Sequence, residues 1–360
     1  MSAIPPPTSF RKTPLYELHA EERGSMAPWR GQLLPSHYTS ILEEHAAANE
    51  SLVMFDLGFR GLARVEGSDA AALINRLATK ETIDLPVGQL CEVPFIYPDG
   101  TLVDLVRVAH EEQNVWLLSF SNPYPKKTFD WIRQEAAGGE CWVNDVSHQY
   151  AWVALVGPSA HDYLASGNPA IQKLEPGRMM EALVAGVAVQ IFRADKNFYA
   201  LACRPELLEK VVHSWWIGDD RPRLCGWASY ENWRLEKGVL RYERELKEGA
   251  NPFELGLDDK IDFDREHFVG RSALIAHQKE GLHQMLVYFT LQAMRLPREN
   301  SPIYSGDRRV GFVCSGGFSP TLRQPIGSAW VKTDDVDFDT LAVEIRRQRH
   351  PMIIKKPPFA

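Results

Sequence analysis

The stretch GFVCSGGFSPTLRQPIGSAWV, residues 311–331, holds two apolar runs on either side of a segment rich in glycine and proline. The runs are typical of short β-strands, and residues 316–320 (GGFSP) indicate a turn with positive φ at the glycines and a fixed φ at the proline. Further short strands are predicted in QMLVYFTLQ (284–292) and LAVEIR (341–346). Gly, Pro and Asp separate these runs. The sequence after about residue 280 therefore predicts an all-β C-terminal domain.

Before that point, helix and strand patterns are mixed and lack the strict alternation of a parallel βαβ sheet. Apolar spacing and flanking Ser, Pro and Gly predict helices at 38–48, 68–79, 125–137, 159–166, 205–216 and 229–239. Apolar runs predict strands at 51–57, 61–67, 115–121 and 150–158, and a hairpin between 187 and 203. Asn251 and Pro252 are suited to cap and open a short helix. An α+β fold is expected.

Length, charge and cysteine content limit the class of protein. A chain of 360 residues is expected to form two or three domains. The net charge of −7 argues against nucleic-acid and membrane-surface partners, and no uncharged apolar run reaches the length of a membrane span. The five cysteines are scattered and show no CxxC spacing. This pattern favours a reducing cytoplasm and argues against a structural metal site.

The common catalytic signatures are missing from the sequence. It contains no Walker loop, no G-x-G-x-x-G after a strand, no G-x-S-x-G and no H-E-x-x-H. Composition and periodicity alone therefore indicate only a soluble multidomain α+β protein.

Seven segments carry a more specific likeness, in order and at suitable distances along nearly the whole chain. They are KTPLYELH (12–19), YTSILEEH (38–45), FDLGFRG (55–61), NPFELGL (251–257), HFVGRSAL (267–274), the quoted 311–331 stretch and IIKKPPF (353–359). Together they resemble the aminomethyltransferase family, whose best-known member is the T-protein of the glycine cleavage system.

The resemblance implies a three-domain cloverleaf around a central tetrahydrofolate pocket, with tetrahydrofolate as the cofactor. We expect residues 1–50 and 148–270 to form a first, discontinuous α+β domain. Residues 51–147 would form a second α+β domain, and residues 271–360 a C-terminal β-barrel-like domain.

Four residues are expected at the cofactor from their positions in the family. Glu236 matches the family in RLEKG, and Ser121 and Tyr242 are expected to contact the folate. The family's loop with the pterin-binding glutamate is shortened here to RADKNFYA (193–200), where Asp195 is the nearest carboxylate.

The strand after the turn at 98–100 carries a departure from the family pattern. Side chains alternate between faces, so Asp104 points one way while Leu105 and Arg107 point the other. The family has two consecutive aspartates here, and an ungapped alignment sets Leu105 at the second, catalytic one. A one-residue slip would instead place Asp104 in the catalytic position. The ungapped register is favoured, and Asp104 stays a candidate catalytic carboxylate.

A second departure concerns two arginines. The family's DVSHM is here DLGFR (56–60), which places Arg60, with Phe59 beside it, near the expected folate. Arg60 and Arg107 could clamp a carboxylate of the substrate with paired hydrogen bonds. The alternatives are surface or ion-paired arginines, or arginines that bind the glutamate tail of the folate.

These changes favour methyl transfer over aminomethyl transfer, because a lost carboxylate weakens charge stabilisation, whereas methyl transfer depends mainly on alignment. We predict a tetrahydrofolate-dependent demethylase whose donor is a small O-, S- or N-methylated carboxylate. An ether donor also needs an acid, and Tyr38, His37, Tyr97 and Tyr242 are candidates by family position. The alternatives are glycine-cleavage aminomethyl transfer and a non-catalytic folate-binding protein.

Overall fold

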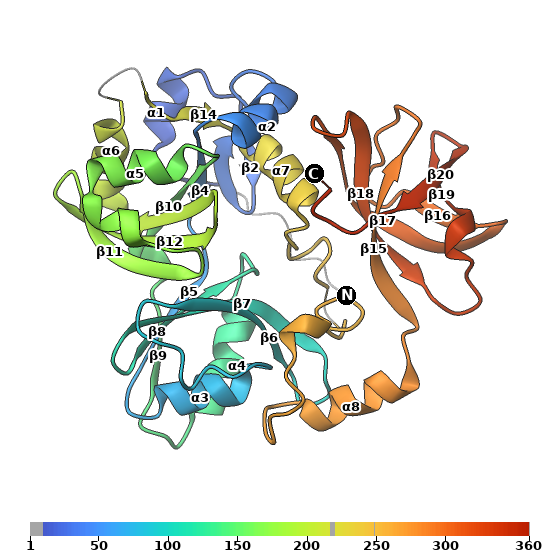
Figure 1. The fold of residues 1–360 in the computed structure, drawn as a ribbon, viewed down its shortest axis with the longest axis horizontal. Helices are drawn as coiled ribbons and strands as arrows, with labels where there is room; N and C mark the ends of the chain where they lie inside the picture. Colours follow the sequence, from blue (N-terminus) through green and yellow to red (C-terminus); the bar gives the residue numbers. More distant parts are fainter. Residues whose placement is uncertain (1–9, 217–219, 248, 360) are drawn as a thin grey trace.

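Three lobes surround a common centre in the computed structural model, which describes residues 10–216, 220–247 and 249–359 (Figure 1). Two lobes mix helices and sheets, and the third is a closed β-barrel. The predicted α+β cloverleaf with an all-β C-terminal domain is confirmed. Within the described ranges, no helix is long and apolar enough to cross a membrane.

The first lobe is built on a six-stranded sheet with helices packed around it. In spatial order the strands are β11 (Arg178–Val184), β12 (Val187–Asp195), β13 (Phe198–Cys203), β10 (Ala151–Val156), β4 (Val53–Gly58) and β14 (Arg223–Cys225). A small sheet adds β1 (Arg11–Lys12), β3 (Gln32–Pro35) and β2 (Met26–Trp29). The helices of this lobe are α1 (Tyr16–Glu21), α2 (Ile41–Glu50), α5 (Ala160–Gly167), α6 (Pro205–Ser214) and α7 (Trp227–Lys237), with 3₁₀ turns η1 (Ser147–Gln149) and η2 (Pro169–Lys173).

The second lobe is a five-stranded antiparallel sheet with two helices. Its strands lie in the order β6 (Leu90–Ile96), β7 (Leu102–Glu112), β8 (Val115–Phe120), β5 (Leu62–Glu66) and β9 (Trp142–Asp145). Helices α3 (Ala70–Leu77) and α4 (Lys126–Ala136) pack on the sheet through the apolar side chains of their buried faces.

The chain crosses between these two sheets at residues 59–61 and returns before β10. β4 belongs to the six-stranded sheet and β5 to the five-stranded one, so this crossing lies later in the chain than the expected boundary after residue 50. Gly58, at the end of β4, is the register partner of Trp152 in β10. The second lobe therefore leaves and rejoins the first at neighbouring strands.

The third lobe is the barrel, which follows helix α8 (Arg271–Glu280). Its strands close in the order β15 (Gln284–Leu291), β18 (Gln324–Lys332), β17 (Arg308–Ser319), β16 (Pro302–Ser305), β19 (Leu341–Ile345) and β20 (Gln348–Ile354). The turn η4 (Phe338–Thr340) precedes β19. Alternate residues of these strands fill the interior, among them Phe289, Val313 and Val343.

The predicted turn at 316–320 is wrong in its first part, because Gly316 and Gly317 lie inside β17 without positive φ. Glycine is required at both positions because neighbouring atoms lie too close to leave room for a Cβ. A Cβ on Gly316 would lie 2.0 Å from the Pro297 carbonyl oxygen, and one on Gly317 would lie 2.0 Å from Asn232 Oδ1 of α7. Gly317 therefore lets α7 pack directly against the barrel, and Gly316 makes room for the segment at Pro297.

Helix α7 ends at the centre of the molecule, where Gly238 adopts a left-handed conformation with φ +76°. The amide of Val239 donates to the Arg234 carbonyl (2.8 Å), which closes the last turn and reverses the chain. The segment after Gly238 thus runs along the point where the three lobes meet (Figure 1).

The expected helix at Asn251 does not form. Asn251 and Glu254 make the two reciprocal hydrogen bonds of a capping box, each 3.1 Å long. The chain then turns, because Gly256 has φ +69° and the Leu257 amide donates back to Pro252. The turn η3 (Asp258–Lys260) follows and reaches the centre.

Candidate functional site

A cavity of about 310 Å³ lies where the lobes meet, and we call it the hub cavity. Strands β7 and β8, helix α7 with the segment after it, and η3 all contribute to its wall. Its lining residues are Arg30, Arg60, Glu92, Leu105, Arg107, Ser119, Phe120, Ser121, Tyr230, Glu231, Arg234, Gly238, Val239, Leu240, Arg241, Leu257 and Lys260. Its size falls within the range of small-molecule sites.

Strand β7 presents Leu105 and Arg107 to the hub cavity. Asp104 is fully buried on the other side of the strand and accepts hydrogen bonds from the amides of Leu105 (2.8 Å) and Asn122 (3.2 Å) and from the Ser121 hydroxyl. Burial raises the pKa of Asp104 to about 6 despite these hydrogen bonds. The ungapped register predicted that Leu105 and Arg107 would face the pocket, and these are the β7 side chains that line the cavity.

The hub cavity is strongly cationic. Its lining holds six basic side chains, five arginines and one lysine, against two carboxylates. Glu92 pairs with Arg107 (3.1 Å) and Lys260 (3.5 Å). Burial of Glu92 opposes its ionisation, but these two cations outweigh burial and hold its pKa below the usual range.

Two of the arginines lack a matching carboxylate. Among the described residues Arg60 has no ion-pair partner, and its Nε is buried without a hydrogen-bond acceptor. Burial lowers the pKa of the Arg60 guanidinium. Burial, with the repulsion of Arg60 and Arg241, also lowers the pKa of Arg30 to about 10. A buried cation without a counter-charge is costly, so this part of the cavity is suited to an anion.

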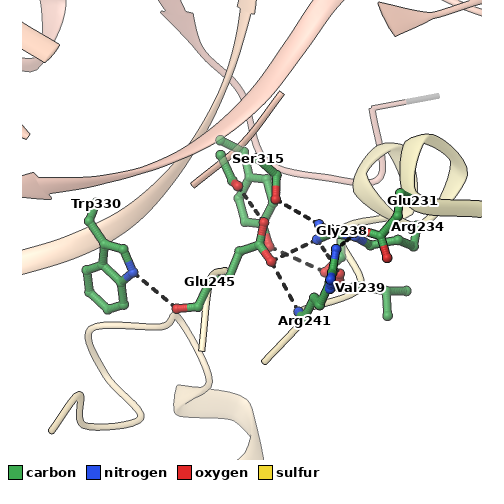
Figure 2. A network of polar contacts seen from close by, with 10 residues as sticks. Glu231, Arg234, Gly238, Val239, Arg241, Glu245, Ser315 and Trp330 are labelled. Atoms are coloured by element: carbon green, nitrogen blue, oxygen red, sulfur yellow. Dashed lines mark hydrogen bonds and ion pairs between the residues drawn. The ribbon is translucent and has the colours of Figure 1, made fainter. Parts of the chain in front are cut away.

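The opposite wall is a network of charged side chains centred on Glu245 (Figure 2). Glu245 accepts from Arg234 Nη1 (2.8 Å), the Arg241 amide (3.1 Å) and a serine hydroxyl of the barrel (2.6 Å). Its own carbonyl accepts from the indole of Trp330 (3.1 Å). Arg234 also donates to Ser315 Oγ (2.7 Å), so the network fixes α7 to the barrel.

The sequence-predicted substrate residues divide between two cavities. Arg60 and Arg107 line the hub cavity together with Ser121, which was expected at the cofactor. Phe59 instead lines a neighbouring, more open cavity that Arg60 also touches, and the Arg11 guanidinium lies 3.2 Å from its ring centroid.

Glu236 and Asp195 lie outside the hub lining. Glu236 is fully buried at the end of α7, where it accepts from Asn49 (3.2 Å) and Thr321 (3.1 Å) and lies 3.4 Å from His45 Nε2. Burial opposes its charge, but these polar neighbours outweigh burial and lower the pKa of Glu236 to about 2. Asp195 ends β12 and accepts from the Asn197 amide in the hairpin turn, which is a structural role.

The four candidate acids also lie outside the hub lining. The Tyr38 hydroxyl is 2.6 Å from His19 Nδ1, and burial with the nearby Asp56 raises the pKa of Tyr38. His37 Nδ1 is 2.9 Å from the Ser36 hydroxyl. Tyr97 and Tyr242 both line a much smaller cavity. The catalytic role of these four residues stays a prediction.

Sequence reasoning missed several hub residues, chiefly Arg30, Glu92, Tyr230, Glu231 and Lys260. Only one local signal was available, because residues 230, 231 and 234 are spaced to share a face of α7. The others come from segments far apart in the sequence. No cluster of His, Cys, Asp or Glu in the described part of the chain could hold a metal ion.

Comparisons with known proteins agree over nearly the whole chain. The GCVT N-terminal domain matches residues 15–265, and the glycine cleavage T-protein C-terminal barrel domain matches residues 284–360. The aminomethyltransferase of Halothermothrix orenii is 30% identical and aligns over 97% of this chain and 100% of its own. That of Bacillus subtilis is 28% identical over 97% and 99% of the two chains.

A solved structure shows the same fold. The crystal structure of the glycine cleavage system aminomethyltransferase T from Bartonella henselae superimposes with a TM-score of 0.89 over 98% of both chains, at 22% identity. Together with the two domain matches, this confirms the resemblance read from the sequence: the chain belongs to the aminomethyltransferase family of glycine cleavage T-proteins.

Proposed function

We propose that this chain moves a methyl group from a small carboxylate-bearing donor to tetrahydrofolate in the hub cavity. Its family comprises folate-dependent one-carbon transferases, and tetrahydrofolate is their cofactor. The observation that carries the choice of donor is Arg60, a half-buried arginine in the cavity wall whose Nε is buried without an acceptor and which has no ion-pair partner among the described residues.

The lining of the hub cavity fits the cofactor. Glu92 and Ser119 offer acceptors for ring N–H groups, and the hub lining also holds apolar side chains, among them Leu105, Leu240 and Leu257. A flat heterocycle needs this combination of apolar walls and a few polar groups. When bound, tetrahydrofolate supplies the nucleophilic N5 amine that accepts the one-carbon unit.

In the proposal the chain's own side chains bind and orient the donor. Arg60 and Arg107 line the same cavity, and the charge of Arg107 adds to burial in lowering the pKa of Arg60, so together they can hold one carboxylate by charge-assisted hydrogen bonds. Leu105 and Leu257 exclude water from the same wall. Fixing the reacting groups in this way lowers the barrier by up to about 7–11 kcal/mol in favourable cases.

The charge of the cavity also favours an anionic donor over a cationic one. With Leu105 at the position that the ungapped register gives to the family's second aspartate, the carboxylates of the lining are Glu92 and Glu231, and both are already paired with cations. For an ether donor, Tyr230 is the tyrosine of the hub lining that could hold the required proton, because its side chain lines the cavity beside Arg60.

Aminomethyl transfer is the second candidate, and the comparisons favour it. The relatives named aminomethyltransferase align with this chain from end to end at 26–30% identity. In that reaction the donor is an aminomethyl group on a lipoyl carrier protein and the folate product is 5,10-methylenetetrahydrofolate.

The deciding experiment is anaerobic incubation of the enzyme with tetrahydrofolate and two sets of donors. One set holds methoxy, methylthio and methylammonium carboxylates, and the other is aminomethyl-loaded carrier protein. Chromatography would identify the product. Formation of 5-methyltetrahydrofolate supports the proposal, and 5,10-methylenetetrahydrofolate from the carrier protein supports the second candidate. Tight folate binding without either product would identify a non-catalytic folate-binding protein.

Two variants test the carboxylate clamp. Arg107→Ala and Arg60→Met should each raise KM for a carboxylate donor about tenfold or more and leave KM for the matching methyl ester nearly unchanged. Arg349→Ala removes an exposed arginine of the barrel and is the matched control. Equal effects on the acid and the ester would reject the clamp.

A further inference from the structure

A second and larger cavity, of about 510 Å³, lies on the other side of the wall described above. We call it the outer cavity. It is bounded by α2 and α7 on one side and by β17 of the barrel on the other. Glu231, Arg234 and Arg241 line both cavities, so these three side chains separate them.

Of the two arginines among these three side chains, only Arg241 has donors left to bind an anion. Arg234 is committed to Glu231, Glu245, Ser315 and a backbone carbonyl. Arg241 uses Nη1 alone, in a 2.7 Å contact with Glu231. Its Nε is buried and finds no acceptor in the described part of the chain. The Nε and Nη2 edge of this guanidinium can therefore take a carboxylate with two parallel hydrogen bonds, without breaking the pair to Glu231.

The rim of the outer cavity is apolar. Ile41 and Leu42 of α2 are 39% and 45% exposed, and Met294 and Leu296 of the segment after β15 are 66% and 53% exposed. Large apolar side chains gathered at the edge of a cavity indicate a binding surface. An apolar rim with a guanidinium at the back fits a ligand with an apolar body and an acid group at its inner end.

We propose that the outer cavity is a second ligand site, separate from the hub cavity, for an amphipathic carboxylate. Its acid group binds the Nε edge of Arg241, and its apolar body lies against Leu42, Met294 and Leu296. This inference is independent of the reaction in the hub, because it depends only on the wall and the rim of the outer cavity.

Calorimetry with a simple probe tests the proposal. Naphthalene-2-carboxylate should bind the intact enzyme in a one-to-one ratio, and the uncharged naphthalene-2-carboxamide should bind about tenfold more weakly or worse. Arg241→Met should weaken binding of the carboxylate by about tenfold or more, and Leu296→Ser by about fivefold. Arg107→Met, which changes only the hub, should leave its binding unchanged.

Each contrary result overturns the proposal. The contrary results are the absence of carboxylate binding, an equal affinity for the carboxamide, and an affinity for the carboxylate that is unchanged in Arg241→Met. A loss in Arg107→Met would place the probe in the hub cavity instead. If Arg241→Met does not fold, Leu296→Ser still decides, because Leu296 is half exposed and its replacement leaves the wall intact.

Discussion

Replacing Gly317 by alanine tests the closest contact between α7 and the barrel. The new Cβ would lie 2.0 Å from Asn232 Oδ1 and 3.1 Å from its Cγ, so the buried amide has to move. That amide accepts from the Phe318 amide (2.9 Å), donates to the Phe318 carbonyl and donates to His45 Nδ1 (2.7 Å). All three hydrogen bonds depend on one orientation of the Asn232 side chain.

The size of the effect follows from these contacts. Overpacking a close contact costs about 1–3 kcal/mol, and each buried polar group left without a partner costs about 1–3 kcal/mol. Displacing Asn232 breaks at least one of its hydrogen bonds completely. We therefore expect Gly317→Ala to lower the free energy of unfolding by about 2–6 kcal/mol.

Urea denaturation followed by tryptophan fluorescence would measure the change. The matched control is Gly167→Ala, because that glycine has ordinary φ and nothing within 4 Å of an added Cβ. Its unfolding free energy should stay within about 1 kcal/mol of the parent or rise slightly. In an Asn232→Ala background the cost of Gly317→Ala should fall by about 2 kcal/mol. The reasoning is refuted if Gly317→Ala behaves like the control, or if its cost is the same in both backgrounds.

Three further predictions concern buried carboxylates. Glu44 accepts the amides of Tyr38 (2.5 Å) and Gly226 (2.8 Å) from opposite segments, so Glu44→Ala should lower the free energy of unfolding by about 3 kcal/mol or more in urea melts. Because burial raises the pKa of Asp104 to about 6, the stability that its protonated form contributes is present below the unfolded value of about 4 and is lost as the pH rises through 6. Between pH 4 and 8 the parent should therefore lose about 3 kcal/mol relative to Asp104→Asn, and a flat difference contradicts the assignment. For Glu236 the dependence of stability on pH has the opposite sign. Its pKa of about 2 means that its contribution is present above the unfolded value and is lost as the pH falls toward 2. Glu236→Gln should thus be about 3 kcal/mol less stable than the parent at pH 7 and approach it at acid pH.

Helices and strands were predicted well from the sequence where the residues that determine them are close together in the chain. Pro125 directly precedes α4, as the sequence indicates, and Ser159 directly precedes α5, although its side chain makes no capping hydrogen bond. The alternation in β7 also predicted that Leu105 and Arg107 share a face. These successes depend on residues within a few positions of one another.

The failures share a cause, which is distance along the chain. Gly316 and Gly317 have the pattern of turn residues, but Gly317 is required by α7, about eighty residues earlier, and Gly316 by the close approach of Pro297. Asn251 forms its predicted cap, but Gly256 ends the turn before a helix develops. The pairing of Glu92 with Lys260 joins positions that no local pattern connects.

The attachment of the second lobe has a consequence for protein engineering. Gly58 and Trp152 are register partners in one sheet, so the segment between them is joined to the first lobe at two adjacent positions. Such a segment can be exchanged as a cassette, because a short bridge would span the gap and leave the parent sheet paired. A chimaera that carries the equivalent cassette of a relative would keep the scaffold of this chain while exchanging the strand that bears Leu105 and Arg107.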